Sequence, residues 1–241
     1  MAEQRTDRIG SPGLLRIDDL PIRVDLRPSL PPIRDQGARS TCLAFAVTAA
    51  HEVIRNDQGE AIEDLSEEVL YWGCKQVDGD REPGSVFPSA FAALAQWGQP
   101  REEFWSYNDN RNDTVISYRP PEGALDVDVC FKAPMRKIDS DIRNIKSWLS
   151  RGYTVALGII LCQSFYTPFQ GAIAMPISDE ELTEGHAVVV VGYEDDSSGG
   201  GFLILRNSWG EDWGEGGYAY LPYAYIDLYR SEAWVVEQQP N

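Results

Sequence analysis

The sequence has no long hydrophobic run, little positive charge, few cysteines and only two histidines. Its 241 residues carry 21 lysines and arginines against 38 aspartates and glutamates, a formal net charge of −17. Binding to nucleic-acid phosphates requires basic patches, so this charge argues against a nucleic-acid partner. A membrane-spanning helix needs about 20 consecutive apolar residues, and no run approaches that length, so we expect no membrane-spanning segment.

The four cysteines are too few for a disulfide framework in a chain of this length. Together with two distant histidines they match no metal-ligand spacing. The segment Gly199–Gly201 lacks the lysine and the helix of a phosphate-binding loop. We therefore expect neither a metal nor a cofactor. We also expect reduced thiols at Cys74, Cys130 and Cys162, with Cys162 as a small core residue.

The first 20 residues contain several charges and no apolar stretch of the kind found in signal peptides. We expect residues 1–20 to form a loose arm. The expected location is the cytoplasm, or that of an effector exported without a classical signal peptide. The chain length allows one large domain or two small lobes around a shared cleft.

Hydrophobic periodicity and capping residues predict the secondary structure. Ser66 precedes two acidic residues, an arrangement typical of a helix N-terminus. The expected helices cover residues 42–55, 65–73, 89–97 and 140–151, and the expected strands cover 154–161, 187–193, 202–206, 217–221 and 233–237. The first helix is apolar on more than one side, which predicts a buried central helix.

A polar, glycine-containing loop changes at Cys42 into the apolar segment Leu43–Ala50. Ser40 or Thr41 can cap a helix that begins there, which places Cys42 in the first helical turn. The positive end of the helix dipole favours the thiolate, which is the nucleophilic form of cysteine. Six residues upstream, the Gln36 side chain can donate a hydrogen bond to a developing oxyanion. The pattern indicates a nucleophilic cysteine.

A thiolate nucleophile needs a base, and the candidates are His51 and His186. His51 lies nine residues after Cys42 on the same expected helix, on its opposite face, so we expect a packing or surface role. His186 precedes the β-branched run of an expected buried strand, and a histidine at a strand mouth can face a cleft. Asn207 ends the next strand, and its side-chain oxygen can orient His186 as an aspartate does in serine triads. Trp209 can shield that hydrogen bond from water.

These motifs resemble, in their order, those of the papain family of cysteine peptidases. The matching segments are Val24–Arg27, Arg34–Gly37 with Cys42–Phe45, Leu65–Glu67, Gly185–Ala187 with Val191–Tyr193, and Asn207–Gly210 with Gly216–Tyr218. The resemblance implies an α+β, papain-like fold over residues 21–236, followed by a tail at 237–241. Residues from about 21 to 135 would form a mainly helical lobe, and residues from about 136 to 236 a β-barrel-like lobe. The active site would lie between the two lobes.

The resemblance also implies a cysteine endopeptidase that hydrolyses protein or peptide substrates through an acyl-enzyme intermediate. Cys42 would be the nucleophile and His186 the general acid and base. Asn207 would orient His186, and Gln36 would contribute to the oxyanion hole. Two alternatives stay open: selective processing, transpeptidation or deamidation of one protein partner by the same residues, and an inactive binding module. The presence of all four residues argues against the binding module.

The expected substrate-binding residues follow from the resemblance. The Gly84–Ser85 segment would pair its backbone with an extended substrate. Small or apolar residues would surround the pocket for the second substrate residue before the cleaved bond, and we expect a hydrophobic preference there. These residues are Phe87, Ala156 or Leu157, Gly185 and Ala187.

Two positions around the nucleophile depart from the family pattern. Arg39 stands where family members usually have a cysteine, and Leu43 stands where they usually have a tryptophan. We therefore expect this chain to lack one disulfide of its secreted relatives. The arm at residues 1–20 is shorter than the inhibitory pro-region of family members, so we expect any inhibition to work differently.

Overall fold

The computed structural model describes residues 20–56, 63–80, 82–115, 117–177, 180, 182–197 and 199–238. The predicted arm lies outside these residues except for Leu20, and only the first two residues of the predicted tail lie within them. Within the described ranges, no helix combines the length and the apolar character needed to cross a membrane.

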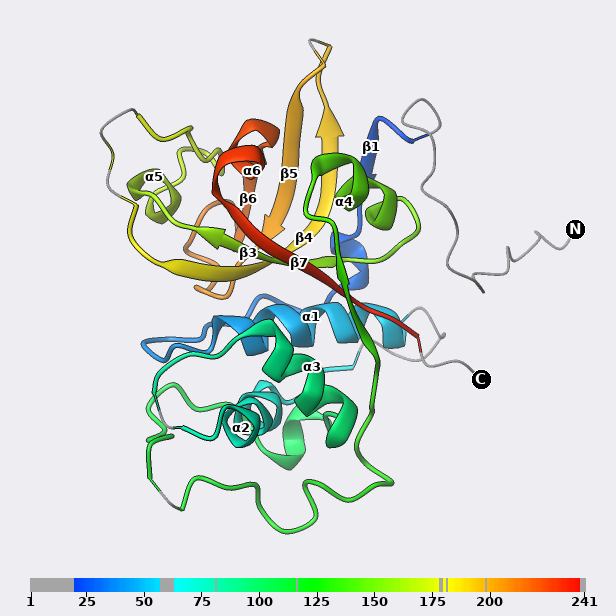
Figure 1. The fold of residues 1–241 in the computed structure, drawn as a ribbon, viewed down its shortest axis with the longest axis vertical. Helices are drawn as coiled ribbons and strands as arrows, with labels where there is room; N and C mark the ends of the chain where they lie inside the picture. Colours follow the sequence, from blue (N-terminus) through cyan, green and yellow to red (C-terminus); the bar gives the residue numbers. More distant parts are fainter. Residues whose placement is uncertain are drawn as a thin grey trace, which may run out of the picture.

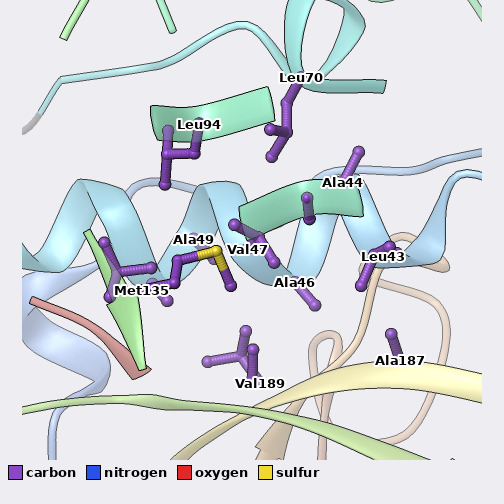
Figure 2. Close-up of a cluster of buried hydrophobic side chains, with 14 of the residues drawn as sticks. Leu43, Ala44, Ala46, Val47, Ala49, Leu70, Leu94, Met135, Ala187 and Val189 are labelled. Carbon is purple, nitrogen blue, oxygen red and sulfur yellow. The ribbon is translucent and has the colours of Figure 1, made fainter. Parts of the chain in front are cut away.

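The helical lobe is built around α1 (Cys42–Asn56), which lies between two further helices and the sheet (Figure 1). The neighbouring helices are α2 (Glu67–Asp78) and α3 (Phe87–Gln96). Every residue of α1 from Leu43 to Ile54 is buried, which confirms the expected central helix. Figure 2 shows the reason: α1 contributes side chains both toward the other two helices and toward the sheet.

The start and the end of α2 follow from its sequence. Ser66 caps the helix, because its hydroxyl accepts a hydrogen bond from the Val69 backbone at 3.2 Å. The helix ends at Gly79, which adopts a left-handed conformation with φ 71° and donates its N–H to the Lys75 carbonyl. The helix starts two residues later and ends five residues later than predicted, because the turn residues around Gly79 form its true end.

The second lobe is an antiparallel sheet with the strand order β2-β7-β3-β4-β5-β6, and β1 pairs additionally with β4. The strands are β1 (Arg23–Asp25), β2 (Met135–Ile138), β3 (Val155–Ile160), β4 (Gly185–Asp195), β5 (Gly201–Arg206), β6 (Tyr218–Pro222) and β7 (Arg230–Val236). The remaining helices are α4 (Ile142–Leu149), α5 (Gln163–Tyr166), α6 (Tyr223–Tyr229) and the 3-10 turns η2 (Arg27–Ser29) and η3 (Glu102–Phe104).

The two faces of the sheet form two separate cores. Ala187, Val189 and their same-face neighbours on β3 and β7 pack against α1. Leu157 and Val188 point the other way, into a core closed by α4, α5 and α6. Alternation of side chains along a strand produces this division, because successive residues face opposite sides of the sheet.

The structure is the α+β, two-lobe arrangement that the sequence predicts, with each long element in its predicted place. Six short elements of the described residues were not predicted: β1, β2, α5, α6 and the 3-10 turns η2 and η3. The two strands have only three and four residues, too few for a recognisable alternation. The strand β1 pairs with β4 of the sheet, although its residues precede the helices in the sequence.

Candidate active site

Cys42 is the first residue of α1 and lies half-buried at the junction of the two lobes. The Thr41 carbonyl begins the helix by accepting the Ala44 N–H at 2.9 Å. The Thr41 hydroxyl, one of the two expected caps, lies 2.8 Å from the Tyr107 hydroxyl. The helix therefore holds Cys42 where the free N–H groups of the first turn surround its thiol.

Backbone N–H groups and burial act on the Cys42 thiol in opposite directions. Burial raises its pKa, while hydrogen bonds from the backbone of Ala187, Leu43 and Cys42 itself lower it. The effect of burial is larger, so the thiol pKa lies above its usual value. The bond from Ala187 places the sulfur beside β4, next to the residue that follows His186.

His186 is held by Asn207 on the neighbouring strand end. Its Nε2 lies 2.8 Å from Asn207 Oδ1, and the Ser208 backbone N–H donates to the same oxygen at 2.9 Å. Ser208 thereby fixes the orientation of the amide, with the oxygen toward the imidazole. Nε2 must then carry the proton, which leaves Nδ1 as the basic nitrogen.

Aromatic rings enclose the imidazole. The Trp209 ring centroid lies 4.8 Å from that of His186, and the Phe165 ring centroid lies 5.8 Å away with an angle of 74° between the ring planes. His186 is only 7% exposed, and burial lowers its pKa to about 4. The bond to Asn207 and the nearby Glu184 carboxylate act in the opposite direction, with smaller effect.

Burial thus opposes a charge on Cys42 and a charge on His186 when each is considered alone. A thiolate next to an imidazolium is different, because the opposite charges attract strongly in a poorly hydrated site. Such an attraction would suit a nucleophile and its base.

The Gln36 loop is bonded to the loop that carries Asn207. Asp35 forms a β-bridge with Trp209, and the Gln36 backbone N–H donates to the Ser208 carbonyl at 2.8 Å. The Ser208 hydroxyl donates to Gln36 Oε1 at 2.6 Å, and Gln36 Nε2 donates to the Arg39 carbonyl at 2.8 Å. Since a side-chain amide has two N–H groups, the second remains available for an oxyanion.

On the substrate side, the structure corrects one prediction. Leu157 is fully buried in the core of the sheet lobe and faces away from α1, so it does not line a pocket beside Phe87. Gly158 takes that place: it pairs with Ala187, and a Cβ atom there would lie 3.4 Å from Phe87 Cε2 and from Ser231 Cβ. Ala156, the alternative to Leu157, shares the α1-facing side.

The two glycines among the predicted substrate-binding residues have open space in front of them. A Cβ atom added at Gly84 or at Gly185 would meet no atom within 4 Å. Gly84 also has φ +87°, a conformation that favours glycine. Ser85 follows it and leads to Val86 and to Phe87 at the start of α3. No side chain therefore stands in front of either glycine, although the Gly84 N–H and C=O are themselves bonded to Tyr71 and Lys75.

Arg39 is a structural residue whose role the sequence did not reveal. Its guanidinium donates to both Glu68 carboxylate oxygens at 2.9 Å and to the Asn108 carbonyl at 2.9 Å. It also pairs with Asp113 at 3.2 Å, and Glu68 is fully buried. All four cysteines are free thiols. A buried ion pair therefore tethers the nucleophile loop at the position where family members usually have a cysteine. The sequence feature that could have indicated this partner is the acidic pair after Ser66, which includes Glu68.

His51 has the packing role that its helical position predicts. It is 1% exposed, and its Nδ1 lies 2.9 Å from Gln99 Oε1. Burial lowers its pKa to about 4, so it is neutral in the folded protein near neutral pH. Among the residues that the structure describes, no three histidine, cysteine or acidic side chains are grouped so as to hold a metal ion.

The chain was compared with known proteins. The model of the papain family cysteine proteases matches residues 20–229. An uncharacterized peptidase C1-like protein of Acanthamoeba polyphaga mimivirus is 26% identical over 223 residues, which are 85% of this chain and 69% of that protein. Cysteine endopeptidase Rep1 of Oryza sativa subsp. japonica is 29% identical; the match covers 84% of this chain but only 53% of Rep1.

A solved structure is similar over almost its whole length. The crystal structure of xylellain, a cysteine protease from Xylella fastidiosa, superposes with a TM-score of 0.82 at 26% identity. The superposition covers 93% of this chain and 88% of that chain.

Proposed function

The chain belongs to the papain family of cysteine proteases, and we propose that it is an endopeptidase that uses Cys42 as its nucleophile. One observation carries this proposal. Cys42 lies at the start of α1, the Ala187 backbone lowers the pKa of its thiol, and His186, the residue before Ala187, is held by Asn207 at 2.8 Å. A nucleophile, a base and a group that orients the base thus meet at the junction of the lobes.

The reaction begins with transfer of the Cys42 proton to Nδ1 of His186. The thiolate attacks the substrate carbonyl carbon, and the carbonyl oxygen becomes an oxyanion. The Cys42 backbone N–H and the second N–H of the Gln36 amide stabilise this oxyanion. Loss of one such donor typically lowers the rate by about 10²–10³.

His186 then acts as an acid. The imidazolium protonates the leaving amine, the C–N bond breaks, and the acyl group stays on the Cys42 sulfur. A water molecule gives its proton to the same imidazole and attacks the thioester, which releases the acid product and restores the thiol. Asn207 keeps the imidazole in one orientation through both steps.

A hydrophobic side chain is the expected second substrate residue before the cleaved bond. Phe87, Gly158 and Ala187 approach one another beside His186, and none of them carries a charge. Gly158 contributes no side chain, and a Cβ atom there would already lie 3.4 Å from Phe87 Cε2, so the Phe87 ring forms this part of the apolar wall. Cleavage of a peptide library tests this preference; a profile with mainly charged residues at that position would contradict it.

The proposed function is tested with an epoxide-type thiol inhibitor and intact-protein mass. We expect one adduct on the wild-type protein and none on Cys42→Ala. Cys130→Ala is the matched control, because Cys130 is the other thiol that is not fully buried, and it should keep the adduct. His186→Ala should react much more slowly, since the thiolate loses its cationic partner.

Turnover of peptides then separates the possible activities. Products with one water added indicate hydrolysis, while a product joined to a second amine indicates transpeptidation by the same acyl-enzyme. Adduct formation without any turnover of peptides or proteins would contradict the proposed endopeptidase.

A further inference from the structure

A buried lysine lies behind the segment predicted to pair with substrate. Lys75, in the last turn of α2, has a side chain only 8% exposed. Its ammonium nitrogen lies 3.0 Å from Asp78 Oδ2 and 2.9 Å from Asp80 Oδ1. It also lies 2.8 Å from the Glu82 carbonyl and 3.1 Å from the Gly84 carbonyl. One cation thus binds three oxygens of the loop after α2 and one at the end of α2 itself.

The same loop is fixed by further bonds around Lys75. Asp80 Oδ1 accepts the Glu82 backbone N–H at 3.2 Å, and the Gly84 N–H donates to the Tyr71 hydroxyl at 3.3 Å. Both the N–H and the C=O of Gly84 therefore bond to side chains of α2. The backbone N–H and C=O of Ser85 form no hydrogen bond to any residue that the structure describes.

This loop leads directly to the active site. Phe87 lies three residues after Gly84 and packs next to Gly158, whose partner in the sheet is Ala187. Ala187 in turn follows His186, and its backbone lowers the pKa of the Cys42 thiol. The bonds that orient the Gly84–Ser85 backbone thus lie only a few residues before Phe87, which lines the predicted pocket.

We propose that Lys75 is a positioning residue, whose ammonium holds the Gly84–Ser85 segment in the orientation that pairs with the extended backbone of a peptide substrate. This inference rests on the proposed function. A loop in which Gly84 uses both its polar groups internally presents the free groups of Ser85 in one direction. Such preorganisation increases affinity, because less conformational entropy is lost when the substrate binds.

Substitution of Lys75 by glutamine tests the inference. The variant keeps a polar side chain but loses the cation and its reach to both carbonyls. We expect KM for an extended peptide substrate to rise about tenfold, the effect of losing roughly one backbone hydrogen bond, with kcat per titrated active site unchanged. Loss of folded protein alone would instead lower the number of active sites and leave KM unchanged.

Two reagents that modify Cys42 give a second readout. A peptidyl epoxide must bind along the cleft, whereas iodoacetamide requires only the thiolate. Lys75→Gln should slow modification by the epoxide about tenfold and leave the rate with iodoacetamide unchanged, when both are followed at Cys42 by peptide mapping. Lys75→Arg, which keeps the charge, should restore part of the epoxide rate.

Lys146→Gln is the matched control. Lys146 is a similarly buried lysine, with its nitrogen 2.6 and 2.7 Å from the carboxylate oxygens of Asp195, on the far side of the sheet. It should change neither KM nor the ratio of the two modification rates. An equal effect of both lysine substitutions, or an unchanged KM in Lys75→Gln, would overturn the inference.

If Lys75→Gln does not fold, Asp80→Asn replaces it. After this substitution the buried Lys75 keeps Asp78 as its counter-ion, so no charge is left unpaired. Because the Asp80 side chain is 56% exposed, we expect the epoxide reaction to be only about twofold to threefold slower, a fraction of the effect of one hydrogen bond. An unchanged rate would overturn the inference. Failure of the proposed function looks different: no peptide turnover by the wild type, with epoxide modification that still depends on Lys75.

Discussion

The buried ion pair between Arg39 and Glu68 provides a quantitative test of what holds the nucleophile loop. The Arg39 side chain is 7% exposed and the Glu68 side chain is fully buried, with two hydrogen bonds of 2.9 Å between them. The perturbation is Arg39→Met, which keeps much of the side-chain volume and removes the charge. Glu68 then remains as a buried carboxylate without its main cation.

The expected loss follows from the partners that remain. Removing one member of a buried ion pair costs about 3–5 kcal/mol. After Arg39→Met, Glu68 keeps the Tyr118 hydroxyl at 2.7 Å and the Asn108 backbone N–H at 3.3 Å as donors. Arg111 Nε, 3.3 Å away, remains as a half-buried cation. We therefore expect the lower end of the range, about 3 kcal/mol of unfolding free energy.

The assay is urea unfolding followed by tryptophan fluorescence, with a double-mutant cycle. Glu68→Leu in the Arg39→Met background removes the stranded charge, so the double variant should be less destabilised than the sum of the single variants by at least about 1 kcal/mol. Arg136→Met is the matched control: Arg136 pairs with Glu237 at the same 2.9 Å distance on the surface. Its loss should cost about 0–1 kcal/mol.

The reasoning is refuted if Arg39→Met and Arg136→Met are equally stable, or if the two substitutions at the buried pair are additive. A second readout links the pair to the site. Gln36 Nε2 donates to the Arg39 carbonyl, so displacement of this loop in Arg39→Met should also slow alkylation of Cys42 in molecules that remain folded.

Three further predictions concern the site and its neighbours. Asn207→Ala should lower kcat less than His186→Ala, because Asn207 only orients the base; an equal or larger loss, measured with the same peptide, would contradict this ranking. Gly158→Ala adds a single Cβ atom 3.4 Å from Phe87 Cε2, an ordinary contact distance, so kcat/KM should fall more for substrates with a large residue at the second position before the cleaved bond than for substrates with a small one. Equal losses for both substrates would contradict the assigned pocket. His51 has a folded-state pKa of about 4, below its usual 6.5, so its contribution to stability is complete above pH 6.5 and is lost as the pH falls toward 4. In His51→Gln the unfolding free energy should therefore fall less between pH 6.5 and pH 4 than in the wild type. An unchanged dependence of the unfolding free energy on pH would contradict the buried, neutral state of His51.

The sequence was sufficient for the features that depend on long patterns. The apolar segment after Cys42 predicts the buried helix, and the β-branched run after His186 predicts the strand that carries it. Asn207 follows β5 and meets His186 because β4 and β5 are antiparallel neighbours. These predictions needed only the type and order of elements, which hydrophobic periodicity indicates well.

The sequence did not predict which face of the sheet a strand residue points to, or which distant residue a side chain bonds to. The error at Leu157 is a shift of one residue, and such a shift moves a side chain to the opposite face of the sheet. The register of β3 against β7 also changes between Leu157 and Ile159, which no local pattern indicates. Arg39 was recognised as a missing cysteine, but its partner Glu68 is 29 residues away and became evident only in the fold.

Cations bonded to the chain on both sides of the cleft suggest how this site is kept rigid without disulfides. Arg39 holds the loop before Cys42, and Lys75 holds the loop before Phe87. Arg206, at the end of β5, donates to the carbonyls of Pro31 and Pro32, which lead into the Gln36 loop. Each cation is largely desolvated and binds backbone carbonyls as well as side chains, and such bonds are directional and stronger than neutral ones. The chain has a surplus of 17 negative charges, and buried acids such as Glu68 serve as counter-ions that offset the cost of desolvating these cations.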